Sequence, residues 1–111
     1  KNHGDNTILG IQTWLERNYQ EELSVESLAE KAFLSTRQLA RWFKSATGES
    51  IVIYVQNLKI EVVKSLLEQS NRKFSDISEA VGYSNESHLR RVFKRHVGLT
   101  PSEYKRKFSI R

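Results

Sequence analysis

The stretch that decides the fold spans residues 85–98 and reads Asn-Glu-Ser-His-Leu-Arg-Arg-Val-Phe-Lys-Arg-His-Val-Gly. Its apolar residues recur at the spacing of one helix face, at Leu89, Val92, Phe93 and Val97. Asn85 is a suitable N-cap, and Gly98 can end the helix in a left-handed conformation. The opposite face is basic and rich in hydrogen-bonding groups. A helix with a packed back and a basic front fits the major groove of DNA.

The same pattern occurs about half a chain earlier, in the stretch that ends at Gly48. Pairs of identical residues separated by 50 positions connect the two stretches: Leu39, Arg41, Phe43, Lys44 and Gly48 with Leu89, Arg91, Phe93, Lys94 and Gly98. An internal repeat of this kind indicates two copies of one structural unit.

Composition limits the classes of function. The 111 residues carry a formal charge of +5, which suggests an anionic partner such as nucleic acid or a membrane surface. There are no cysteines, which excludes disulfides and Cys-based zinc sites and fits a reducing cytoplasm. No stretch approaches the roughly 20 apolar residues of a membrane span, and the polar start lacks the apolar core of a signal peptide.

Periodicity and turn signals predict an all-α fold of seven helices, in which two helix-turn-helix subdomains are joined by a long linker helix. Residues 1–6 read as a flexible linker from a missing N-terminal part. Residues 7–50 form the first subdomain, residues 51–69 the linker helix and residues 70–111 the second subdomain.

Capping signals place the starts of the shorter helices. Ser24 and Ser75 are the expected N-caps of the two short helices that precede the basic ones. Ser35 and Gln38 have the spacing of a capping box, and Thr100 is followed by a proline at the first helical position.

Two such units on one linker resemble a repressor dimer fused into one chain. Dimers of helix-turn-helix units place their reading helices about 34 Å apart, which is one turn of B-DNA. The duplication is direct, so we expect a non-palindromic site that spans about two helical turns.

The chemistry of the front faces suggests which residues contact bases. Arginine can donate two hydrogen bonds to guanine, and glutamine pairs similarly with adenine. Glu86 either accepts from cytosine or is a first-turn carboxylate favoured by the helix dipole. Arg90 lies at the flank, where it contacts phosphate or pairs locally, and His88 either contacts DNA or is simply exposed. The candidate base contacts are Arg37, Gln38, Ala40, Arg41, Glu86, Ser87, His88, Arg90 and Arg91.

The candidate phosphate contacts stand near the starts and ends of the same helices, where a helix rises out of the groove. They are Ser35, Thr36, Lys44, Ser84, Asn85, Lys94 and Arg95. A charged helix front is usually just a solvated face. The repetition of Arg41 as Arg91, each opposite a Leu-x-x-x-Phe stripe, favours DNA contact instead.

Two motifs resemble the AraC/XylS family of bacterial transcription regulators. The first runs from Leu28-Ala29-Glu30-Lys31-Ala32 through Ser35-x-x-x-Leu39-x-Arg41-x-Phe43-Lys44-x-x-x-Gly48. The second is Ile77-x-x-x-Val81-Gly82-Tyr83-Ser84-x-x-x-x-Leu89-x-Arg91-x-Phe93-Lys94-x-x-x-Gly98-x-Thr100-Pro101-x-x-Tyr104. The resemblance covers residues 8–108.

The resemblance implies sequence-specific binding to double-stranded promoter DNA, usually with activation through RNA polymerase. It also implies that a small-molecule effector acts only through a missing domain. The sequence around Trp14, Ile53-Tyr54-Val55 and Leu66-Leu67 resembles members with an amidotransferase-like N-terminal domain. Carried over by position, the family's base contacts fall on Arg37, Ala40 and Arg41 and on Glu86, Ser87, His88, Arg90 and Arg91.

Departures from the family pattern fall mainly in the first unit. Phe33 stands where the family usually has glycine, and phenylalanine does not easily take positive φ, so the first turn is expected to differ in shape. Ile51 replaces the usual proline, and Lys59 stands where arginine is common in the linker helix.

Two other classes of function fit the sequence less well. A helical protein-interaction module would keep the fold, but it predicts apolar helix fronts, whereas these fronts are basic. An enzyme is not supported, because the chain has no Ser-His-Asp arrangement and no phosphate loop, its histidines are too dispersed for a metal site, and no cofactor is implied.

Overall fold

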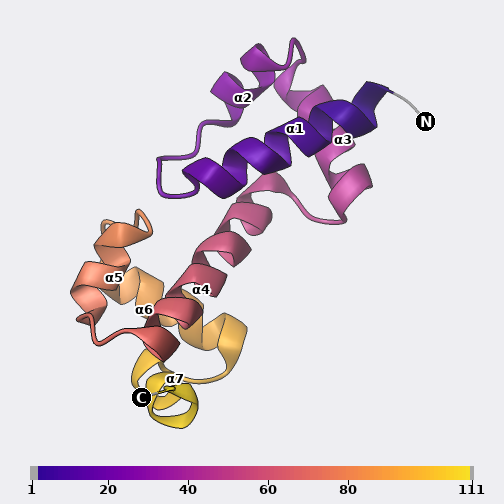
Figure 1. The fold of residues 1–111 in the computed structure, drawn as a ribbon. Helices are drawn as coiled ribbons and strands as arrows, with labels where there is room; N and C mark the ends of the chain where they lie inside the picture. Colours follow the sequence, from indigo (N-terminus) through magenta and orange to yellow (C-terminus); the bar gives the residue numbers. More distant parts are fainter. Residues whose placement is uncertain (1–2, 111) are drawn as a thin grey trace. The chain divides into compact units, whose positions relative to one another are not determined.

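The computed structural model describes residues 3–110, and this part of the chain is all α-helical, with seven helices (Figure 1). The helices are α1 (His3–Asn18), α2 (Val25–Lys31), α3 (Thr36–Thr47), α4 (Ile51–Gln69), α5 (Phe74–Ala80), α6 (Glu86–Val97) and α7 (Pro101–Phe108). The predicted fold class and number of helices are confirmed. None of these helices is long and apolar enough to cross a membrane.

Two boundaries differ from the sequence prediction. Helix α1 begins at His3, so residues 3–6 are helical rather than a flexible linker; residues 1 and 2 lie outside the described part. Helix α5 begins at Phe74 after Lys73, whose side chain makes no capping hydrogen bond, so the prediction of Ser75 as the N-cap is wrong. The other predicted caps are in place at Ser24, Ser35, Asn85 and Thr100.

The chain forms two compact units, and the boundary between them lies within α4, after Leu58. The helix contributes a different apolar set to each core. Ile51 and Val55 are buried in the first unit, whereas Ile60, Val63 and Leu67 are buried in the second. Thus α4 contributes buried residues to both units.

Each unit centres on a phenylalanine of its basic helix that meets a tyrosine edge to face. In the first unit the ring centroids of Phe43 and Tyr54 are 5.2 Å apart, with an interplanar angle of 82°. In the second unit Phe93 and Tyr104 repeat this arrangement at 5.6 Å and 82°. Both phenylalanines are fully buried, and such pairs are worth about 0.5–1.5 kcal/mol beyond their buried area. The repeat seen in the sequence is therefore a repeat in core packing.

The tyrosine hydroxyls fasten these rings to neighbouring helices. In the first unit Tyr54 accepts a hydrogen bond from Gln12 and donates one to Glu16, both on α1. In the second unit Tyr104 donates to Glu68 near the end of α4. Burial of the Tyr104 hydroxyl, and to a smaller extent this hydrogen bond, raises the pKa of Tyr104 to about 12.

The two turns have the same backbone conformation despite different residues. Phe33 has φ 59° and Gly82 has φ 84°. In each turn the N–H of the next residue donates a hydrogen bond to a backbone carbonyl of the preceding helix. Leu34 N–H donates to the Ala29 carbonyl at 2.9 Å, and Tyr83 N–H donates to the Ser78 carbonyl at 2.9 Å. This is the pattern of a Schellman motif. The expectation that Phe33 would give the first turn another shape is therefore wrong.

Replacing Phe33 with glycine should stabilise the chain by about 1 kcal/mol, because a left-handed conformation costs a non-glycine residue roughly 1–2 kcal/mol. The Phe33 side chain is 94% exposed, so little packing is lost with it. Urea unfolding of Phe33→Gly and of the control Phe33→Ala checks this. Alanine removes the ring but keeps the strain, so an equal gain in both variants would contradict the explanation.

The stability of the second unit should fall between pH 10 and about 12. The Tyr104 hydroxyl ionises near pH 10 in an unfolded chain and near 12 in the folded one, so unfolding releases a proton in this range. Below pH 10 this contribution is fully present, and it is lost as the pH rises. Unfolding free energies of the parent and Tyr104→Phe, measured from pH 8 to 12, should converge; a constant difference across that range would exclude this role.

Candidate nucleic-acid interface

Helix α3 carries a basic face opposite its buried stripe. Leu39 and Phe43 are fully buried, and Ser35 caps the helix by accepting a hydrogen bond from Gln38 N–H at 3.0 Å. At the other end Gly48 takes the left-handed conformation, with φ 84°. The side chains on the opposite face are exposed: Arg37, Ala40, Arg41, Lys44 and Ser45.

These five residues line one open hollow on the surface of the first unit. The structure therefore brings together Arg37, Ala40 and Arg41, which are predicted base contacts, with the predicted phosphate contact Lys44. Gln38 is half-buried and does not line the hollow. Ala46 continues the helical spacing of Leu39 and Phe43 but is exposed.

Helix α6 repeats this design in the second unit. Leu89, Val92 and Phe93 are fully buried, Asn85 accepts a hydrogen bond from His88 N–H at 2.9 Å, and Gly98 ends the helix. Cations in the last turn are favoured by the helix dipole. The exposed predicted contacts on or beside this helix are Ser84, Asn85, Ser87, His88, Arg90, Arg91, Lys94 and Arg95.

Arg90 is held at one side of this face. Its guanidinium lies 2.9 Å from the Glu86 carboxylate, one turn earlier on α6. It also lies 4.8 Å from the ring centroid of Phe74 on α5, within cation–π distance. Of the alternatives weighed from the sequence, local pairing of Arg90 with a first-turn Glu86 is therefore the arrangement in the free protein.

His88 has a neighbour that sequence reasoning missed. The ring centroid of Tyr83, in the turn before α6, lies 5.7 Å from that of His88. The Lys59 ammonium lies 5.0 Å from the centroid of the same Tyr83 ring. Burial lowers the pKa of Lys59. Contacts between α4, the turn and α6 thus hold the start of the second basic helix, and only three-dimensional packing reveals them.

The described residues offer no group of three or more histidine and carboxylate side chains that could hold a metal ion. The basic surface of the described residues is formed by two capped helices, α3 and α6. Each presents hydrogen-bond donors to solvent and buries an apolar stripe behind them.

Comparison with known proteins agrees with this arrangement. A family model described as a helix-turn-helix domain matches residues 28–107. The multiple antibiotic resistance protein MarA of Escherichia coli is 31% identical over 99 residues, which cover 89% of this chain and 78% of MarA. The chain belongs to the AraC-type helix-turn-helix family.

A second relative of this AraC-type domain is longer. The bifunctional transcriptional activator/DNA repair enzyme AdaA of Bacillus subtilis is 32% identical over 95 residues, or 86% of this chain. The chain spans only 45% of AdaA. The match is thus to a domain, and the activities of the longer relatives are not transferred with it.

Solved structures share the AraC-type fold. The DNA-binding domain of the global transcriptional factor AdpA, in complex with a target DNA, superposes with a TM-score of 0.86 at 26% identity, covering 91% of each chain. An AraC-type regulator of Chromobacterium violaceum superposes at 0.84 with 28% identity, covering 98% of each chain.

Proposed function

We propose that this AraC-type domain is the DNA-binding part of a bacterial transcription regulator and reads double-stranded promoter DNA with α3 and α6. The observation that carries the proposal is the pair of exposed arginines, Arg41 and Arg91, at equivalent positions of two capped helices. Each lies opposite a fully buried Leu–Phe stripe, so the helix is fixed while its front is free for a ligand.

Base contact is assigned mainly to arginine. Arg37 and Arg41 of the first unit and Arg91 of the second can each pair with guanine O6 and N7 in the major groove. Ala40 meets a thymine methyl, and Ser87 and His88 read bases near the start of α6. Gln38 and Glu86 are half-buried, so they act at the edge of the contact. Arg90, which pairs with Glu86, orients the helix start more than it reads a base.

Phosphate contact is assigned to the helix ends. Lys44 stands in the last turn of α3, and Lys94 and Arg95 stand in the last turn of α6. At the starts of the helices, Ser35, Thr36, Ser84 and Asn85 are exposed beside backbone N–H groups, which favour anions. These contacts fix the register on DNA without selecting its sequence.

The full arrangement has two recognition helices in successive major-groove segments, with subdomains at residues 7–50 and 70–111 joined through residues 51–69. In the cytoplasm of a bacterium such a domain would activate transcription by contact with RNA polymerase. A small-molecule effector, including one bound by an amidotransferase-like domain, would act through another part of the protein. The basic helix fronts favour this proposal over a helical protein-interaction module.

Selection from a random-duplex library tests the proposal, with the parent chain, Arg41→Ala and Arg91→Ala. The parent should enrich two blocks about one helical turn apart, and each variant should lose its own block, at a cost of about 1–3 kcal/mol in affinity. The reason is that truncation removes a bidentate contact to one base pair.

Arg17→Ala is a matched control of equal charge change. Arg17 is an exposed residue of α1 outside the proposed contacts, so this variant should retain both blocks. If a block is lost only with Arg91→Ala, the first unit does not read the DNA sequence. Binding that is weak, salt-sensitive and without an enriched motif would reject sequence-specific reading and favour the interaction module.

A further inference from the structure

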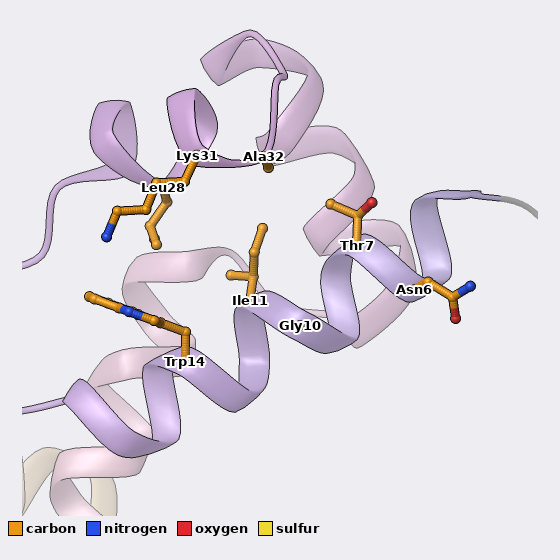
Figure 2. Close-up of a pocket in the computed structure, with 8 residues that line it drawn as sticks. All are labelled: Asn6, Thr7, Gly10, Ile11, Trp14, Leu28, Lys31 and Ala32. Carbon is orange, nitrogen blue, oxygen red and sulfur yellow. The ribbon is translucent and has the colours of Figure 1, made fainter.

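A groove of about 280 Å³ opens between α1 and α2 of the first unit (Figure 2). It is lined by Asn6, Thr7, Gly10, Ile11, Trp14, Leu28, Lys31 and Ala32. Small-molecule sites usually have volumes of about 300–1,000 Å³. A groove just below this range fits one or two side chains of a peptide better than a drug-sized ligand.

Gly10 lies in the middle of α1 and lines the groove. A glycine inside a helix costs about 1 kcal/mol relative to alanine. Apart from its chain neighbours and the nearby backbone of its own helix, no atom lies within 4 Å of the place where a Cβ would stand, so packing within the chain does not require the missing side chain. Its effect is to leave the helix backbone open for the close approach of another group.

Phe33 follows Ala32, at the end of α2 that borders the groove. The ring is 94% exposed, and its residue holds a left-handed conformation that the second unit assigns to Gly82. The turn therefore does not need the ring. Near one groove the chain thus has two residues, Gly10 and Phe33, that lower stability and gain nothing from internal packing.

The lining of the groove favours an acidic, apolar occupant. Its floor is formed by apolar side chains, with Ile11 pointing from α1 toward α2 (Figure 2). The one formal charge among the lining residues is Lys31, whose ammonium lies 4.6 Å from the centroid of the Trp14 ring. A carboxylate can reach this ammonium while an apolar side chain covers Trp14, a residue type enriched where partners bind strongly.

We infer that this groove docks an amphipathic acidic helix of a partner protein. An apolar anchor of the partner packs over Gly10 and Ile11, a neighbouring carboxylate pairs with Lys31, and Phe33 extends the apolar contact at the edge. This is the helix-in-groove mode of recognition. The site lies outside the residues assigned to DNA, so the inference goes beyond the proposed function and does not rest on it.

Two synthetic peptides test the inference. Each is an amphipathic helix of about 15 residues, long enough to form a helix, with leucine on one face. The probe carries glutamate on its polar face, and its counterpart carries lysine. Titration of the fluorescein-labelled peptides with the full chain, followed by anisotropy, should show the acidic probe binding at least about tenfold more tightly than the basic one.

Two variants locate the binding. Gly10→Leu fills the open groove and should weaken the acidic probe at least about tenfold, and Lys31→Glu should reverse the preference between the peptides. Leu9→Ala is the matched control, because Leu9 is an exposed neighbour of Gly10 on α1 that does not line the groove. Its binding should match the parent, and a cooperative melting transition no lower in temperature than that of the parent would show that the Gly10→Leu variant folds.

Equal binding of the two peptides, or tight binding that survives Gly10→Leu, would overturn the inference. Self-association of the chain that Gly10→Leu abolishes would assign the groove to a second copy and overturn it as well. The DNA selection and the peptide titration distinguish the failure of this inference from the failure of the proposed function. A chain that selects DNA but ignores the acidic peptide rejects only the groove, whereas one that binds the peptide and selects no DNA rejects only the proposed function.

Discussion

The edge-to-face contact between a phenylalanine and a tyrosine is the interaction on which each unit depends. Phe43 with Tyr54, and Phe93 with Tyr104, hold the backs of α3 and α6 against the next helix in the chain. Because these rings fix the rotation of each basic helix about its own axis, they also fix which side chains face solvent. Arg41 and Arg91 point outward because Phe43 and Phe93, two positions later, are fully buried.

The sequence predicted the features that depend on local spacing. The apolar stripes of α3 and α6, their caps at Ser35 and Asn85, and their ends at Gly48 and Gly98 follow from periodicity and residue chemistry, and the structure confirms them. These features suffice for the fold class. They also place most of the candidate contacts on exposed helix fronts, since a strictly amphipathic helix leaves little choice of which face is buried.

The features that the sequence missed depend on tertiary contacts. The hydrogen bonds that close the Schellman motif hold Phe33 at positive φ, although its propensity opposes that conformation. Arg90 is drawn to Phe74, which lies 16 positions away in the chain, and the groove beside Gly10 exists only because α1 and α2 lie next to each other. Neither the contact between Arg90 and Phe74 nor the groove can be predicted from local periodicity.

The central claim is that both basic helices lie in the major groove of one DNA site. Methylation interference on the selected duplex tests it most directly, because a methyl group on guanine N7 blocks the bidentate approach of arginine. The account predicts two clusters of interfering guanines about one helical turn, or roughly 10 base pairs, apart. A single cluster, or interference confined to adenine N3 in the minor groove, would contradict it.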